Sequence, residues 1–269
     1  MLMTLQQRHN VNVAGEGAAI MVFVHGFGCD QRMWRLLVPH FSQRYRTVLL
    51  DLVGSGRSDL NAYDFDKYAC LHGHAADVLE IVEAHAAIPV VLVGHSVGAM
   101  IGMLACIKAP QRFAALVMVG PSPCYINDGD YVGGFTRADI QGLLDTMESN
   151  YLGWSSNMAP AIMGAPDQPE LGAELTNSFC RTDPDIARHF AQATFLSDHR
   201  AQLPLLGTPT LILQCSDDFI APRCVGEYMA RTISNSALHV IDNVGHCPHL
   251  SAPSPSIDAM ESFLHGRGL

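Results

Sequence analysis

A serine between two glycines is the residue in this chain best suited to chemistry. Residues 90–100 read VVLVGHSVGAM, in which an aliphatic run ends at Gly94-His95-Ser96-Val97-Gly98. A strand, a tight turn and a helix in this order form a nucleophile elbow, which holds the serine hydroxyl at the tip of the turn. Glycine on both sides removes the Cβ atoms that would collide there. Ser96 is therefore the expected nucleophile, and the alternative is a turn whose serine only caps the helix.

A serine hydroxyl becomes a strong nucleophile only when a base removes its proton and an acid orients that base. Residues 211–222, LILQCSDDFIAP, run from a buried strand into Asp217 and Asp218. A carboxylate at the carboxyl end of a strand lies at the edge of a parallel sheet where ligands bind. Residues 240–249, VIDNVGHCPH, supply His246 just after the next strand, whereas His249 lies farther into the following segment. We predict His246 as the base and one of the two aspartates as the acid.

The negative charge that develops on a substrate carbonyl needs two converging N–H donors. One is expected from Val97, the residue after the nucleophile. The other is expected from Phe27 in FVHGFG, residues 23–28, where a strand enters a glycine-containing turn. The Phe27 ring would also form part of the pocket wall.

The elements that must position these residues alternate along the chain. Strand-like runs occupy residues 20–24, 47–50, 90–93, 116–119, 210–214 and 238–241, with helical patterns at 74–87 and 97–109. Uniformly apolar strands between helices predict an α/β fold with a mostly parallel sheet covered on both faces. Residues 121–200 contain helical patterns and no strand-like run. We predict a core of residues 1–120 and 201–269 with a helical cap inserted at 121–200.

The cap offers large apolar side chains, which either pack its helices together or line a pocket above Ser96. We expect the pocket wall to include Phe27, Phe135, Trp154, Met158, Ile162, Phe190 and Phe195, while Met163 is a further apolar residue of the cap.

The composition excludes several classes of partner. The 269 residues carry a net charge of −10 and no cluster of lysine and arginine, so nucleic acid and anionic membrane surfaces are not expected partners. The N-terminus has no signal-peptide pattern, and eight cysteines without regular spacing indicate reduced thiols in a cytoplasmic protein. His246 with His249, and His72 with His74, resemble metal ligands, but no second ligand pair accompanies either, so no metal and no cofactor is expected.

With HGFG, DLVGSGRSD, GHSVG, SDDFIAP and GHCPH, the chain resembles the α/β-hydrolases over nearly its whole length. The segments HGFGCDQRMW, VGPSPCYINDGDYVGGF and FLSDHR further resemble the subgroup that contains the bacterial stress regulator RsbQ and the plant strigolactone and karrikin receptors. The resemblance implies four helices in the cap and a triad of Ser96, Asp218 and His246. It favours Asp218 because the family's acid commonly lies four residues before a proline, here Pro222. Asp217 is then a turn or capping residue.

The resemblance leaves two functions open. In the first, the protein is a slow serine hydrolase of a small hydrophobic ester or lactone that senses a signal. Its partner would then be a PAS-domain serine/threonine phosphatase or another signalling protein. In the second, it is a metabolic carboxylesterase or lactonase with no signalling partner. The cap motifs favour the sensor.

Overall fold

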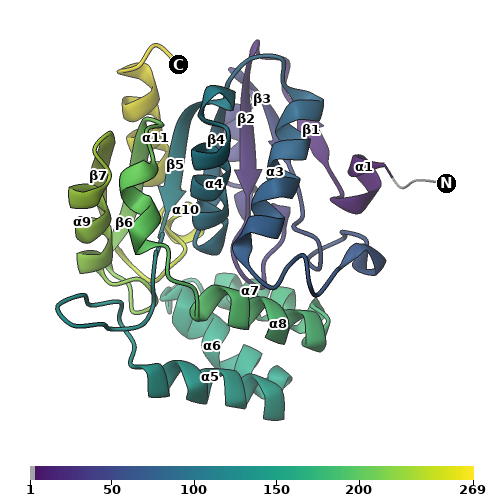
Figure 1. Ribbon diagram of the computed structural model, residues 1–269, viewed down its shortest axis with the longest axis vertical. Helices are drawn as coiled ribbons and strands as arrows, with labels where there is room; N and C mark the ends of the chain where they lie inside the picture. The colour runs from purple at the N-terminus through teal and green to yellow at the C-terminus, as the bar shows by residue number, and fades with distance from the viewer. Residues whose placement is uncertain (1–3) are drawn as a thin grey trace.

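A seven-stranded sheet runs through the structure, a computed structural model that describes residues 4–269 (Figure 1). Its strands lie in the order β1-β3-β2-β4-β5-β6-β7, and every neighbouring pair is parallel except β1 with β3. The strands are β1 Asn12–Ala14, β2 Ala19–Val24, β3 Tyr45–Leu49, β4 Val90–His95, β5 Phe113–Val119, β6 Thr210–Asp217 and β7 Ser236–Val244. The predicted α/β-hydrolase fold with a mostly parallel sheet is confirmed.

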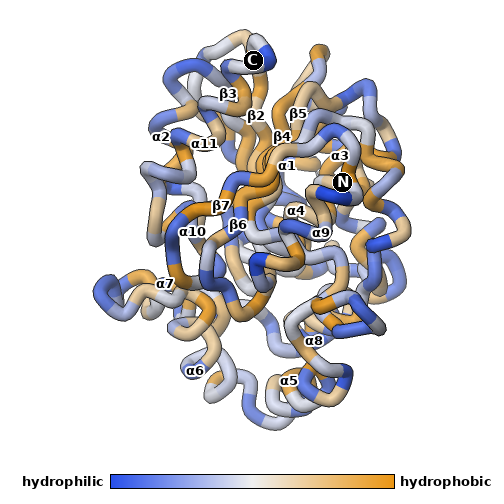
Figure 2. The backbone as a smooth tube through the Cα atoms, turned by 90° about the vertical axis from the view of Figure 1, so that its left-hand side faces the viewer, coloured by the Kyte–Doolittle hydropathy of each residue, from blue (hydrophilic) through white to orange (hydrophobic). Residues whose placement is uncertain are grey.

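Helices cover both faces of this sheet (Figures 1 and 2). On one face lie α3, α4 and α9, and on the other lie α2 and α11. The core helices are α1 Leu5–Arg8, α2 Val38–Phe41, α3 Leu71–His85, α4 Val97–Lys108, α9 Arg223–Thr232, α10 Pro248–Ser251 and α11 Pro253–His265. Short 3-10 helices are η1 Gln31–Trp34, η2 Leu60–Ala62, η3 Pro110–Arg112 and η4 Arg200–Leu205.

The apolar strands explain why both faces are covered. Along β2, Met21 and Phe23 point into one buried cluster while Ile20, Val22 and Val24 point into the other. A strand whose alternate side chains both need burial requires a helical layer on each side. The tube in Figure 2 is accordingly most hydrophobic along the central strands.

Four helices lie where the parallel strands end, at the lower part of Figure 1. They are α5 Arg137–Ser149, α6 Tyr151–Met163, α7 Pro169–Arg181 and α8 Pro184–Phe195. The division into a core and a cap at residues 121 and 200 stays a prediction. Pro160 lies inside α6. The helix continues because Pro160 is exposed, so water can reach the carbonyl that a proline leaves without an N–H partner.

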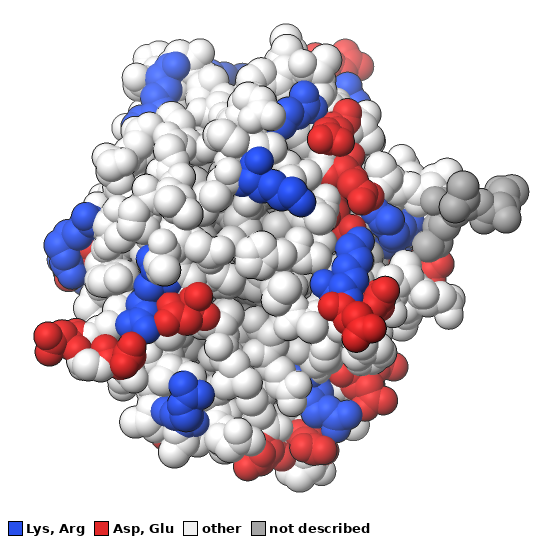
Figure 3. Space-filling model, viewed as in Figure 1, with Lys and Arg blue, Asp and Glu red and all other residues white. Residues whose placement is uncertain are grey.

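The surface and the helix lengths bear on possible partners. On the face drawn in Figure 3, lysine and arginine are interspersed with aspartate and glutamate rather than gathered into one basic patch. In the part of the chain that the structure describes, no helix has both the length and the apolar character needed to cross a membrane.

Candidate active site

Ser96 occupies a sharp turn between β4 and α4. Its backbone has φ 54° and ψ −122°, a conformation that L-residues rarely adopt. The two flanking glycines permit the turn because a Cβ on Gly94 would lie 2.5 Å from the Gly98 carbonyl oxygen. A Cβ on Gly98 would lie 2.4 Å from the carbonyl oxygen of His25. The Ser96 N–H donates to the Val119 carbonyl at 2.8 Å, which ties the turn to the neighbouring strand β5.

Ser96, His246 and Asp218 form one continuous hydrogen-bonded chain. His246 Nε2 lies 2.8 Å from Ser96 Oγ, and His246 Nδ1 lies 2.7 Å from Asp218 Oδ2. The three residues come from the ends of three different strands, since Ser96 follows β4, Asp218 follows β6 and His246 follows β7. In this arrangement a carboxylate can orient an imidazole that accepts the serine proton.

The two neighbouring aspartates differ in environment. Asp218 is 5% exposed, and its Oδ1 accepts hydrogen bonds from the N–H groups of Ile220 and Ala221 at 2.9 and 3.2 Å. These contacts fix the carboxylate while Oδ2 faces His246. Asp217 is exposed at the end of β6, and its backbone carbonyl accepts the Gly245 N–H at 2.8 Å. Only Asp218 is therefore positioned to act on His246.

The backbone of His246 is also contacted by a second buried histidine, His95. His95 Nε2 lies 2.9 Å from the His246 carbonyl oxygen, and the two rings have centroids 5.0 Å apart. Burial holds the pKa of His95 well below its usual range, with the neighbouring His249 and His246 acting in the same direction. A neutral His95 then donates its Nε2 proton to that carbonyl and fixes the backbone of His246.

The two backbone N–H groups predicted to stabilise an oxyanion have no hydrogen-bond partners within the described part of the chain. Among residues 4–269, neither the Val97 N–H nor the Phe27 N–H donates a hydrogen bond. Val97 is the first residue of α4, whose first-turn N–H groups have no acceptor within the helix. Both remain available to an oxyanion.

Ser96 and His246 line a small space of about 30 Å³, here called the catalytic cavity. Its wall is mostly apolar and comes from both the core and helices α6–α8. The lining residues are Phe27, Cys29, His95, Ser96, Tyr125, Ile162, Leu175, Phe179, Thr194, Phe195, Ile220, His246 and Cys247. A space of this size holds one or two water molecules, so a larger ligand requires its walls to move.

Of the predicted wall residues, Phe27, Ile162 and Phe195 line the catalytic cavity. The other four, Phe135, Trp154, Met158 and Phe190, are not among its lining residues in this structure. Trp154 stacks on the wall residue Phe179, with ring centroids 5.4 Å apart. Phe190 packs against the rings of Phe27 and His74. Phe135 and Met158, like Phe27, are half-buried against the buried cluster that contains Met21 and Phe23, here called the core cluster. Met163, named only as a further apolar residue of the cap, is buried in that cluster.

The sequence reasoning missed two large wall residues, Tyr125 and Phe179. Tyr125 is 2% exposed, and burial raises the pKa of its phenol to about 12. Phe179 is also 2% exposed and packs edge-on against Phe27 at 5.9 Å. The amphipathic pattern of α7 places Phe179 on its buried face, but it does not tell which buried residues of that face reach Ser96.

A second, larger hollow lies between η1 and α7. It has a volume of about 300 Å³ and shares Cys29 and Leu175 with the catalytic cavity. Its other walls carry Asp30, Arg32, Glu170, Glu174 and Arg181, and none of its lining residues belongs to the Ser96–His246–Asp218 chain. It therefore lies next to the site of chemistry without containing it.

Comparison with known proteins gives relatives over almost the entire chain. The model of the Alpha/beta hydrolase family matches residues 21–259. A probable esterase of Oryza sativa subsp. japonica is 40% identical over 251 residues, covering 93% of each chain. A karrikin insensitive 2 receptor CA of Petunia hybrida is 38% identical over 262 residues, covering 97% of each chain. The solved structure of a hydrolase from Oleispira antarctica is 41% identical, with a TM-score of 0.94, covering 97% of this chain and 96% of the other.

Proposed function

This chain belongs to the alpha/beta hydrolase family, and on that premise we propose that it cleaves a small hydrophobic ester or lactone as a signal-sensing regulator. The observation that carries the proposal is the hydrogen-bonded chain from Ser96 through His246 to Asp218. Its setting supports the same reading, because all three residues are nearly buried and Ser96 and His246 line a mostly apolar cavity.

In the proposed reaction Ser96 Oγ passes its proton to His246 Nε2 and attacks the carbonyl carbon of the substrate. The electron pair displaced onto the carbonyl oxygen is stabilised by the N–H groups of Val97 and Phe27. The intermediate collapses, the C–O bond to the leaving group breaks, and that oxygen takes the proton from His246. A water molecule then repeats the sequence on the acyl-serine, with His246 again as the base.

The proposed substrate class follows from the cavity. Its wall supplies aromatic and aliphatic side chains together with the hydroxyl groups of Tyr125 and Thr194, and no lysine or arginine. A compact uncharged ester or lactone matches these surfaces, whereas a charged acid would lose its hydration without an ionic partner. The proposal assigns no cofactor to this reaction.

The sensing role rests on how α5–α8 are attached. Helix α7 provides Phe179 and Leu175 to the cavity, and its Ser178 hydroxyl donates to the Gly28 carbonyl at 2.8 Å. A ligand that displaces Phe179 must therefore shift α7, whose outer side is at the surface. We propose that a cytoplasmic partner, such as a PAS-domain serine/threonine phosphatase, recognises that shift. Of the two plant relatives, one is named a receptor.

A metabolic esterase without a signalling partner is the second proposal. The relative from Oryza sativa is named an esterase, and the structure from Oleispira antarctica is described as a hydrolase. This proposal uses the same Ser96 chemistry and gives helices α5–α8 no role in signalling.

Paired substitutions of the two aspartates test the proposed triad. Asp218→Asn should lower kcat for p-nitrophenyl acetate by about a thousandfold or more, because an amide opposite His246 Nδ1 favours the wrong tautomer. Asn can keep the acceptor oxygen for Ile220 and Ala221, so the fold should persist. Asp217→Asn is the matched control and should stay within a few-fold of the unmodified protein. Equal losses at the two positions would refute the assignment.

Labelling by a fluorophosphonate provides an independent test of the nucleophile. The probe should attach to Ser96 and fail to attach to Ser96→Ala. Hydrogen exchange then separates the two proposals, because a sensor should show altered protection in α7 and α8 when Ser96 carries the probe. Changes confined to the ends of β4, β6 and β7 would favour the metabolic esterase.

A further inference from the structure

We propose that His95, Cys247 and His249 form a binding site for a thiophilic cation such as Zn²⁺, and that its occupation inhibits hydrolysis. Among residues 4–269, these three are the group in which at least three possible metal-ligand atoms converge, all within 4.8 Å of one another. All three residues are buried, with exposed fractions of 2%, 1% and 0%.

The distance between Cys247 and His95 is close to that between a sulfur and a nitrogen ligand of one zinc ion. His95 Nε2 lies 3.9 Å from Cys247 Sγ. Tetrahedral zinc with its usual bond lengths separates a sulfur from a nitrogen ligand by about 3.6 Å. A shift of a few tenths of an ångström would therefore bring these two atoms into place.

The group carries polar atoms that the surrounding residues do not satisfy. Neither His249 Nδ1 nor His249 Nε2 has a hydrogen-bond partner among the described residues. Buried imidazole nitrogens without partners are uncommon in folded proteins. His249 packs against the ring of His95 with centroids 4.5 Å apart and against Trp34 at 4.8 Å, so the ring is fixed while its lone pair is unused.

Two imidazoles and a thiol form a donor set that suits a soft cation. Cys247 would lose its thiol proton to solvent as the metal–sulfur bond forms. The nearby Arg35 opposes a cation, but its charge is offset by Glu174 at 2.7 Å.

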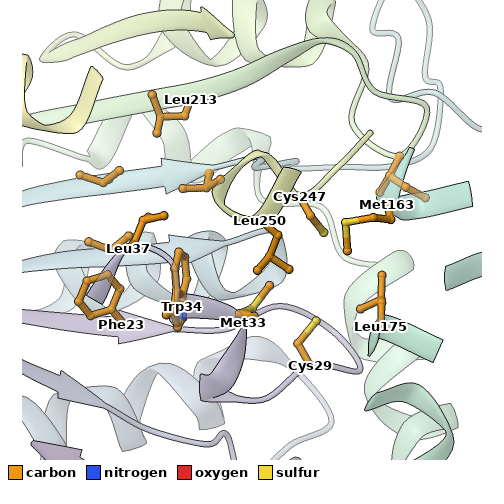
Figure 4. Packing of buried hydrophobic residues seen from close by; sticks show 14 of the residues in the cluster. Phe23, Cys29, Met33, Trp34, Leu37, Met163, Leu175, Leu213, Cys247 and Leu250 are labelled. Atoms are coloured by element: carbon orange, nitrogen blue, oxygen red, sulfur yellow. The ribbon is translucent and has the colours of Figure 1, made fainter. Parts of the chain in front are cut away.

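The catalytic cavity provides the route to this site. Both His95 and Cys247 line it, and both lie outside helices α5–α8. Figure 4 shows Cys247 between Leu250 and Met163, with its sulfur among apolar side chains of the core cluster. Thiolate and imidazole select zinc-like ions over Mg²⁺ and Ca²⁺, which prefer oxygen ligands.

Inhibition follows from the contact that His95 makes with His246. A metal on His95 Nε2 takes that nitrogen from the carbonyl of His246, which it otherwise holds at 2.9 Å. It also places positive charge on the His95 ring, whose centroid lies 5.0 Å from that of His246. The positive charge that His246 must acquire during the reaction is then less favourable. Together these effects should lower kcat on the order of a hundredfold.

Zinc and cobalt binding to the whole chain test the proposal. After treatment with EDTA, the protein should bind one Zn²⁺, and Co²⁺ should give a thiolate-to-cobalt charge-transfer absorption. Cys247→Ser and Cys247→Ala should lose that absorption, and His249→Phe should weaken binding at least tenfold. Cys106→Ala, which removes a thiol that is also 1% exposed but lies in the other core cluster, should bind like the unmodified protein.

Inhibition rests on the proposed hydrolase function, whereas metal binding does not. Zn²⁺ should inhibit ester hydrolysis by the unmodified protein and by Cys106→Ala, and Mg²⁺ should not. A Cys247 variant that folds by circular dichroism should be resistant. Absence of both zinc binding and the cobalt absorption would overturn the site. Equal inhibition of the Cys247 variants would also overturn it, because zinc would then bind elsewhere, for example at Ser96 and His246.

Discussion

Replacing Phe179 by alanine should enlarge the catalytic cavity and lengthen the acyl chain that the protein accepts. The Phe179 ring separates the cavity from Trp154, on which it stacks, and lies close to Gly28, where a Cβ would be 2.3 Å from its Cδ1. Removing the ring leaves room for about three or four methylene groups. Each methylene that moves from water into this apolar space contributes about 0.8 kcal/mol, a factor of about four in kcat/KM.

The expected change is therefore about a hundredfold in the ratio of kcat/KM for p-nitrophenyl hexanoate to that for p-nitrophenyl acetate. The same substitution should destabilise the fold by about 3–5 kcal/mol, as is usual when a buried phenylalanine is truncated. For a chain of this length that corresponds to a lower Tm by about 6–20 °C.

Phe41→Ala is the matched control. Phe41 is also 2% exposed and also has two aromatic neighbours, with centroids 5.2 Å from His40 and 6.2 Å from Tyr45, but it lies in α2 and does not line the cavity. It should lose similar stability and keep the chain-length profile. The reasoning is refuted if Phe179→Ala loses stability while its hexanoate-to-acetate ratio stays at that of Phe41→Ala.

Two further predictions concern stability and the elbow. Burial lowers the pKa of His74 to about 3. Below about pH 6.5 the unfolded chain therefore binds a proton that the folded chain does not. The contribution of a neutral His74 to stability is complete above that pH and decreases as the pH falls. Urea unfolding should therefore show the unmodified protein losing about 2 kcal/mol more between pH 7 and pH 5 than His74→Phe, which keeps the stack on Tyr68. Gly98→Ala should lower stability by about 1–3 kcal/mol and reduce hydrolysis, because its Cβ would push α4 away from His25; an unchanged melting temperature and rate would contradict this.

Strands could be predicted well from the sequence where burial on both faces gives a continuous apolar run. Each of the six predicted runs overlaps one of the strands β2–β7, although the ends differ by up to three residues where a strand continues into less apolar positions. Strand β1 was missed, since Asn12–Ala14 is a three-residue exposed edge strand whose pairing with β3 leaves no hydrophobic signature. Helix α3 was predicted about three residues late at its start, because Leu71 lies before the polar His72 and Gly73.

The predicted features of the site also differ in whether they depend on short motifs or on packing between distant parts of the chain. The segments around Ser96, Asp218 and His246 each contain their own strand and turn, so their geometry can be expected from short motifs. The cavity wall depends on how α7 and α8 rotate against the core, which the amphipathic pattern limits only to a face. The association of His95 with Cys247 could not be predicted by spacing, since His95 ends β4 and Cys247 follows β7, and only the folded sheet brings the two together.

The backbone of Ser96 has a consequence for directed evolution. A non-glycine residue at φ 54°, ψ −122° reduces stability by about 1–3 kcal/mol, and glycine would relieve that strain. A library screened only for heat resistance would therefore enrich Ser96→Gly, which has no hydroxyl. Any selection for a more stable form of this protein has to measure turnover in the same round, or it will discard the proposed nucleophile first.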